Sequence, residues 1–190
     1  MAVIGSGPIG SELGQAFQRL GTDVTFVDRA PDFLPREDRD AAEILLEQLR
    51  ADGCKFIMNA QTNRIELLEP GNAEEEKLPQ MRLHVTEDGQ EKQLDVEMIL
   101  LATGRKANVN NMGLDVAGVE FSERDGIYNN DKMQTSNADI FTVGDCAAAA
   151  SSRQEAETNP GTGPQFTHNS DVMARSVVRN ALFFGAVSRK

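Results

Sequence analysis

Three glycines near the start of the chain form the pattern best suited to chemistry. Gly5, Gly7 and Gly10 follow a short apolar run at the spacing G-x-G-x-x-G. In such a turn the first glycine permits a tight bend, the second lets a pyrophosphate approach the backbone, and the third lets a helix pack close to a strand. Free N–H groups at the start of that helix favour anions. We therefore expect Gly5, Gly7, Pro8, Ile9 and Gly10 to bind a dinucleotide.

An acid follows this turn at the distance expected of a ribose-binding carboxylate. Asp28 comes directly after residues 24–27 and lies 18 residues after Gly10. This is close to the spacing of ~20 residues expected of an acid that accepts a hydrogen bond from a ribose 2′-OH. The same carboxylate would repel a 2′-phosphate, which favours NADH over NADPH. Arg29 beside it would soften that preference by pairing with a phosphate. Glycine turns are common, but here strand, helix, second strand and acid fall in register, which favours dinucleotide binding over a chance turn.

The segments around these residues predict an α/β fold built on a parallel sheet. Residues 1–4, 24–27 and 55–58 are short apolar strands, and segments of helical periodicity separate them. Asp38 is placed to begin the second helix and Gly53 to end it. The expected apolar faces are Leu13, Ala16, Phe17 and Leu20 in the first helix and Ala42, Leu45, Leu46 and Leu49 in the second. Right-handed crossovers would give a doubly wound, Rossmann-like parallel sheet.

A β-meander is expected next, because the pattern changes to alternation. Leu83 and Val85 alternate with polar neighbours, and Asp88-Gly89 is a hairpin turn signal. The expected strands are residues 64–68, 80–86 and 92–96, and they would cover one side of the parallel sheet. Residues 97–105 then form another apolar strand. Its end at Gly104 should lie beside the glycine turn, at the carboxyl edge where open α/β sheets bind nucleotides.

The second half of the chain carries weaker patterns. Residues 140–145 are apolar and end in Gly144-Asp145, which predicts a strand that points a carboxylate into a binding crevice. Residues 147–164 are small, polar and rich in Pro and Gly, which predicts a loop. A helix should begin between Thr167 and Ser170. Its expected apolar stripe is Met173, Val177, Ala181 and Phe184, with Gly185 at its end.

Composition narrows the classes of function. The chain has 190 residues, 39% hydrophobic and 26% charged, which is typical of a globular protein of one domain or two small ones. A net charge of −11 argues against nucleic acid or an anionic membrane as partner, and no apolar run is long enough to span a membrane. Cys54 and Cys146 are too far apart in sequence for a short-spaced redox or metal pair, so no metal site is expected. These features favour the cytoplasm, with an organelle stroma or matrix as the alternative.

Four segments together resemble the flavoprotein disulfide reductases, or pyridine nucleotide-disulfide oxidoreductases, which include dihydrolipoamide dehydrogenase, glutathione reductase and mercuric reductase. The segments are residues 3–13, 101–105, 135–145 and 165–183, in the order that the family has them. The last of them is most similar to the mercuric-reductase-like branch. The resemblance implies that residues 1–104 are an NAD(P)-binding domain and residues 105–190 part of an FAD-binding domain.

The resemblance also implies roles for individual residues. Asp145 would hydrogen-bond the FAD ribityl chain, with Gly144 beside it. Thr167 and His168, at a helix N-terminus, would sit at the flavin's pyrimidine edge, where the helix dipole stabilises negative charge on reduced flavin. Glu12 matches a glutamate near the nicotinamide and flavin. Gly104 is also expected to bind a cofactor.

Other family features are not found in the chain. It has no second glycine-rich turn for the FAD adenosine diphosphate, no Cys-x4-Cys redox pair and no dimerisation domain with a His-Glu pair. Pro8 replaces an aromatic gate of glutathione reductases, and Ala107 replaces a common proline. We therefore expect a fragment with no catalytic residue of its own. Its partners would be the missing FAD-domain half and dimerisation domain of a homodimeric parent.

The predicted function is the NAD(P)-binding portion of an FAD-dependent NAD(P)H oxidoreductase, which passes hydride from NAD(P)H to FAD. A dihydrolipoamide dehydrogenase fragment and a non-catalytic dinucleotide-binding module are the alternatives. A cysteine pair upstream in the parent would favour the enzyme. The electron acceptor stays open, because the residues that meet it are not in this chain.

Overall fold

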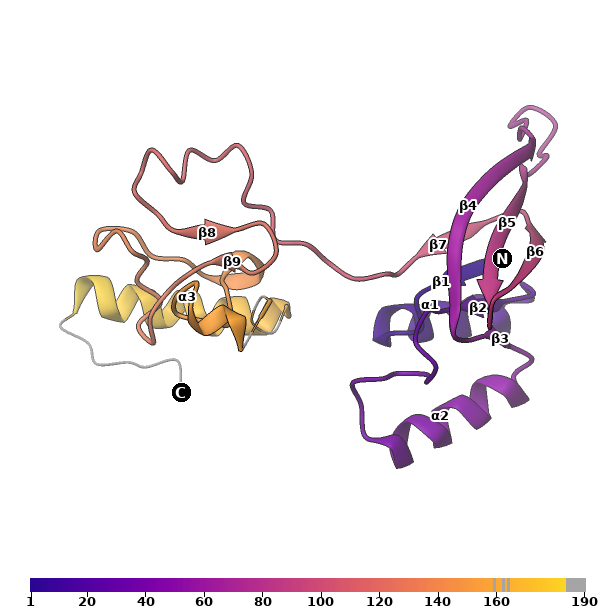
Figure 1. Ribbon diagram of the computed structural model, residues 1–190, viewed down its shortest axis with the longest axis horizontal. Coiled ribbons are helices and arrows are strands. Elements are labelled where there is room, and N and C mark those ends of the chain that lie inside the picture. The colour runs from indigo at the N-terminus through magenta and orange to yellow at the C-terminus, as the bar shows by residue number, and fades with distance from the viewer. Residues whose placement is uncertain (159, 162, 164, 184–190) are drawn as a thin grey trace. The chain divides into compact units, whose positions relative to one another are not determined.

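The structure, a computed structural model, describes residues 1–158, 160–161, 163 and 165–183 (Figure 1). The chain divides into two compact units, Met1–Gly104 and Arg105–Lys190. Among the described residues, no helix has both the length and the apolar character needed to cross a membrane.

The first unit is built on a four-stranded parallel sheet with the strand order β3-β2-β1-β7. The strands are β1 (Ala2–Ile4), β2 (Thr25–Val27), β3 (Lys55–Ile57) and β7 (Ile99–Leu101). Every residue of β1 and β2 is buried, as expected for central strands of a parallel sheet. The predicted α/β fold is thus confirmed. The strand expected at 97–105 is shorter than predicted but does pair with β1.

Two different layers cover the two faces of this sheet. Val3 and Phe26 face the helices α1 (Pro8–Arg19) and α2 (Arg39–Ala51), in one core that includes Leu49. Ala2, Ile4 and Val27 belong to a second core, against the antiparallel meander β4 (Ala60–Glu69), β5 (Gln80–Glu87) and β6 (Gln90–Val96). Because strand side chains alternate in direction, each short strand contributes to both cores. Figure 1 shows the meander strands rising from the sheet.

The predicted meander is confirmed. Leu83 and Val85 are completely buried, and the strands run antiparallel in the order β4-β5-β6. Asp88 and Gly89, both with positive φ, form the tight turn between β5 and β6. On the other face of β5, Arg82 donates two hydrogen bonds to Asp95. β4 begins earlier than predicted, three residues after β3 ends.

The predicted apolar face of α1 is wrong in part. Phe17 packs against the core, but Leu13 is 42% and Leu20 82% exposed, and Ala16 is also exposed. The buried residues are instead Gly10, Ser11 and Gly14. Small residues occupy the buried positions because the backbone of α1 lies very close to the sheet. A Cβ at Gly14 would come within 2.4 Å of the Phe26 ring.

The predicted position of α2 and its predicted apolar face are confirmed. Ala42 and Leu49 are buried, and Leu45 and Leu46 pack against the same core. The helix follows Asp38 at its N-cap, although the Asp38 side chain makes no capping hydrogen bond. At its other end, Gly53 follows the C-cap with φ +102°.

The second unit contains the hairpin β8 (Phe121–Ser122) and β9 (Gly126–Ile127), the 3-10 turns η1 (Gly144–Cys146) and η2 (Glu155–Glu157), and α3 (Thr167–Leu182). The prediction of a strand at residues 140–145 is wrong. Phe141 forms only an isolated bridge to Gln134, and the left-handed φ of +77° at Gly144 turns the chain into η1 instead of extending it.

Helix α3 begins at Thr167, inside the predicted window. Met173 is buried and Val177 packs beside it, whereas Ala181 is exposed, so the predicted stripe holds only for the first half of the helix. Phe184 and Gly185, expected at its end, lie outside the described residues.

Candidate functional site

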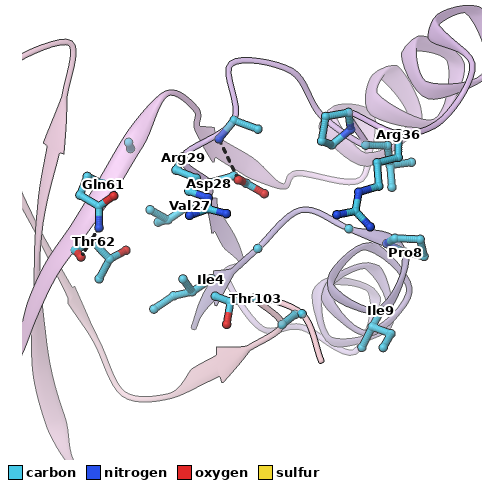
Figure 2. Close-up of a pocket in the computed structure, with 18 of the residues that line it drawn as sticks. Ile4, Pro8, Ile9, Val27, Asp28, Arg29, Arg36, Gln61, Thr62 and Thr103 are labelled. Atoms are coloured by element: carbon cyan, nitrogen blue, oxygen red, sulfur yellow. Dashed lines mark hydrogen bonds between the residues drawn. The ribbon is translucent and has the colours of Figure 1, made fainter. Parts of the chain in front are cut away.

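A cleft of about 860 Å³ opens at the carboxyl ends of β1, β2 and β7 (Figure 2). Residues from four separate stretches of the first unit line it, at 4–5 with 7–9, at 27–30 with 34–37, at 60–62 and at 102–104. It contains seven of the residues predicted to bind a cofactor, which are Gly5, Gly7, Pro8, Ile9, Asp28, Arg29 and Gly104. Gly10 and Glu12 are not among the lining residues, and Glu12 is exposed on α1.

The three glycines of the turn have three different surroundings. Gly5 has φ +103°, and a Cβ there would lie 2.4 Å from the Ala102 carbonyl oxygen, so the turn packs against the end of β7. A Cβ at Gly10 would lie 2.2 Å from the Gly5 carbonyl oxygen. At Gly7 a Cβ would meet nothing within 4 Å. Gly5 and Gly10 are therefore required for packing, whereas Gly7 faces open space.

The start of α1 is open to an anion. Gly7 is the N-cap in an extended conformation, Pro8 occupies the first turn, and no side chain caps the helix. The helix is 12 residues long, and its first turn contains no acid that would compete for the positive end of the dipole. A phosphate group is the kind of ligand that such a terminus accommodates.

Asp28 is held rigidly at the end of β2. Its Oδ2 accepts hydrogen bonds from the Ser6 amide at 2.6 Å and the Ser6 hydroxyl at 2.7 Å, and its Oδ1 accepts one from the Ala30 amide at 2.9 Å. Partial burial acts to raise the pKa of Asp28, but these hydrogen bonds and the Arg29 charge outweigh it and lower the pKa below its ordinary value. The carboxylate is therefore ionised at neutral pH.

Some lining residues were not predicted from the sequence, notably Arg36, Gln61, Thr62 and Thr103. Arg36 lies on the loop between β2 and α2 and extends toward Pro8 (Figure 2). The neighbouring Phe33 and Leu34 are buried, which anchors this loop over the cleft. In the sequence, the one signal of such an anchor was that Phe33 and Leu34 are apolar in an otherwise polar, proline-containing loop.

In the second unit, four predicted residues gather where η1 contacts α3. A Cβ at Gly144 would lie 2.9 Å from Ser170 Oγ, so η1 packs tightly on the first turn of α3. Arg105 Nη1 lies 3.4 Å from Asp145 Oδ2 and donates to the Gln165 carbonyl at 2.9 Å. Thr167 opens the helix.

Next to Thr167, the His168 ring stacks on Phe166 with a centroid distance of 5.2 Å. No acid lies in the first turn of α3 and no side chain caps it. A negative group could therefore approach this helix start, beside the half-exposed Asp145 side chain.

Both cysteines are free thiols. Cys54 is buried, and burial raises the pKa of its thiol. Cys146 lies within 3.5 Å of Thr142 Oγ1 and 3.4 Å of the Val143 carbonyl oxygen. Within the described part of the chain, no group of three or more His, Cys, Asp or Glu residues is arranged to hold a metal ion.

A parallel sheet with a glycine turn at its carboxyl edge and an acid at the end of the next strand places the first unit among the Rossmann-like α/β folds. The comparison with protein families agrees over both units. Residues 1–173 match the pyridine nucleotide-disulphide oxidoreductase family, and the chain belongs to that family. The resemblance found in the four sequence segments is thereby confirmed.

Two similar proteins are a dihydrolipoyl dehydrogenase and a mercuric reductase. The chain is 33% identical over 147 residues to a dihydrolipoyl dehydrogenase of Thermus scotoductus, a match that covers 77% of this chain and 30% of that protein. It is 31% identical over 190 residues to a mercuric reductase of Staphylococcus aureus, covering 100% of this chain and 30% of that protein. The chain thus spans about a third of the length of these relatives.

A solved structure gives a similar result. The HOCl-induced flavoprotein disulfide reductase RclA from Escherichia coli is 30% identical, with a TM-score of 0.79, over 99% of this chain and 37% of that one. The predicted combination of a parallel sheet and antiparallel strands is therefore a family fold, and not a chance arrangement of local patterns.

Proposed function

We propose that the first unit binds NAD(P)H in the cleft beside the glycine turn. The observation that supports this most is the convergence of the turn, the uncapped start of α1 and the ionised Asp28 on one cleft. The residues fit the group. A Cβ at Gly7 would enter unfilled space where a pyrophosphate could approach, and Asp28 supplies a charged acceptor for a ribose hydroxyl.

The expected preference is for NADH, with modest discrimination. Asp28 accepts from a ribose 2′-OH and repels a 2′-phosphate, which favours NADH. Arg29 and Arg36 line the same cleft and offer positive charge to a phosphate, which reduces the penalty for NADPH.

We further propose that the second unit supplies part of an FAD site. Asp145 would accept from the ribityl chain, and the start of α3 at Thr167 and His168 would stabilise negative charge at the pyrimidine edge. Arg105 orients Asp145 and the Gln165 carbonyl that precedes the helix. When both cofactors are bound, they supply the hydride donor and acceptor; the residues of this chain bind and orient them.

The parent protein proposed here is an FAD-dependent NAD(P)H oxidoreductase, homodimeric, whose remaining FAD-domain half and dimerisation domain complete the site. The mercuric-reductase-like branch is favoured because that match extends over the whole chain. A dihydrolipoamide dehydrogenase is the second candidate, supported by the slightly higher identity over a shorter span. A non-catalytic dinucleotide-binding module would have the same cleft without a redox partner.

Titration calorimetry with NADH and NADPH tests the binding proposal. We expect saturable binding by the wild-type chain and none by Gly7→Val, because a side chain there would fill the space for the pyrophosphate. A Cβ at Gly7 would have no protein neighbour within 4 Å, and the residue has a φ of −74°, so Gly7→Val should fold. A wild-type chain that is folded by circular dichroism and gives no heat at millimolar nucleotide would refute the proposal.

A further inference from the structure

Ser6 occupies the variable position inside the glycine turn, and it is fully buried. It is not among the residues that line the cleft. Both its amide and its hydroxyl donate to the same oxygen, Asp28 Oδ2, at 2.6 and 2.7 Å. Ser6 therefore contacts the Asp28 carboxylate from the protein side, while a nucleotide would approach from the cleft.

These contacts limit what Asp28 can offer a ligand. A carboxylate has roughly four lone-pair sites. Ser6 uses two of them and the Ala30 amide uses one, which leaves about one for a ribose that carries two hydroxyls. The three donors also disperse the negative charge that would repel a 2′-phosphate. Removing the Ser6 hydroxyl would free an acceptor site and concentrate the charge, while the Ser6 amide would keep the carboxylate in place.

We propose that Ser6 is a positioning residue that sets cofactor discrimination, because its hydroxyl reduces the ability of Asp28 to favour NADH over NADPH. The inference rests on the proposed dinucleotide binding and specifies the ligand preference of that site. It predicts that a variant without the hydroxyl discriminates more strongly than the wild type, which is the opposite of what damage to the site would produce.

The experiment compares the Kd values of NADH and NADPH for wild type, Ser6→Ala and Ser6→Gly by calorimetry. We expect both variants to raise the ratio of the NADPH Kd to the NADH Kd about fivefold, the effect of one ordinary hydrogen bond. The glycine variant serves as a second route if the alanine variant folds poorly. An unchanged ratio, or a ratio that falls, would overturn the inference.

Ser11→Ala is the matched control. Ser11 is also buried, in the first turn of α1, but its hydroxyl donates to the Gly7 carbonyl at 2.9 Å and the Ser6 carbonyl at 3.4 Å and does not touch Asp28. Its loss should weaken both nucleotides by the same factor. In an Asp28→Ala background, Ser6→Ala should no longer change the ratio, since the hydroxyl acts through that carboxylate. A ratio change that persists without Asp28 would contradict the proposal.

A measurement without nucleotide provides an independent readout. Carbon-13 NMR titration should show that Ser6→Ala raises the pKa of Asp28 toward its ordinary value, because a hydrogen bond to the charged form is lost. An Asp28 pKa that does not move would overturn the inference. Failure of the wild-type chain to bind either nucleotide would refute the proposed function and the inference together, whereas normal binding with an unchanged ratio would refute the inference alone.

Discussion

Gly10 lies directly against Gly5: a Cβ at Gly10 would come within 2.2 Å of the Gly5 carbonyl oxygen and 3.2 Å of the Val3 side chain. The first turn of α1 and the glycine turn are therefore in backbone contact. The glycine at this position keeps the start of the helix, and its free N–H groups with it, close to the end of β1.

Gly10→Ala should destabilise the first unit, because the obstructing atom is backbone and cannot rotate away. We expect a loss of about 1–3 kcal/mol, the usual cost of overpacking. Denaturant unfolding followed by circular dichroism measures this loss. Gly7→Val is the matched comparison, since its side chain meets no protein atom; its unfolding midpoint should stay close to wild type. Equal stability of the two variants would contradict this account of the turn.

Asp28→Ala should narrow the difference between NADH and NADPH. The variant loses both the ribose acceptor and the charge that repels a 2′-phosphate, so NADH binding should weaken more than NADPH binding. Calorimetric Kd ratios test this, with the exposed Asp32 of the same loop replaced by Ala as the control. A ratio that stays at the wild-type value would mean that Asp28 does not contact the ribose.

Asp125 should make the second unit sensitive to acid. Its carboxylate accepts from the Gly161 amide at 2.8 Å, Ser122 Oγ at 2.7 Å and the Tyr128 hydroxyl at 3.1 Å. These hydrogen bonds, that of Gly161 first, lower the pKa of Asp125 from its ordinary value of 3.8. The stabilisation is complete above the unfolded-state pKa and is lost as the pH falls through the lower folded-state pKa.

Asp125→Asn should therefore cost about 2 kcal/mol at neutral pH and flatten the fall in unfolding free energy below about pH 4. Thermal unfolding between neutral and acidic pH measures both effects. Asp139→Asn, at an exposed position in the same unit, is the control and should leave the curve unchanged. Parallel pH curves for Asp125→Asn and wild type would show that this carboxylate does not act as described.

The isolated chain should be colourless and should not oxidise NAD(P)H with a disulfide or mercuric ion. Its two cysteines are free, one of them buried with a raised pKa, and each lacks a partner at short spacing. Flavin absorbance of the purified protein and an NADH oxidation assay with a disulfide acceptor test the expectation. A yellow chain that turns over would contradict it.

Much of the first unit could be predicted from the sequence, because short-range patterns determine it. Short apolar runs predicted the strands β1, β2 and β3, and the alternation of apolar and polar residues predicted β5. The spacing of the glycines and Asp28 predicted a binding site at the carboxyl edge of the sheet, where the cleft lies. The second unit was less predictable. Residues 140–145 look like a strand by composition, yet Gly144 with its positive φ ends the extended segment and begins η1, and composition does not report φ.

The sequence by itself determined where the strands of the first unit lie along the chain, the glycine turn and the acid that follows it. These features depend on residue type and on spacing along the chain. Only the tertiary structure decided which face of α1 is buried, that Arg36 reaches the cleft, and that Ser6 saturates one oxygen of Asp28. The physical reason is that backbone approach and hydrogen-bond occupancy depend on atoms far apart in sequence. Helical periodicity ranks Leu13 and Leu20 as core residues, whereas close contact between α1 and the sheet makes Gly10, Ser11 and Gly14 the buried residues of the helix.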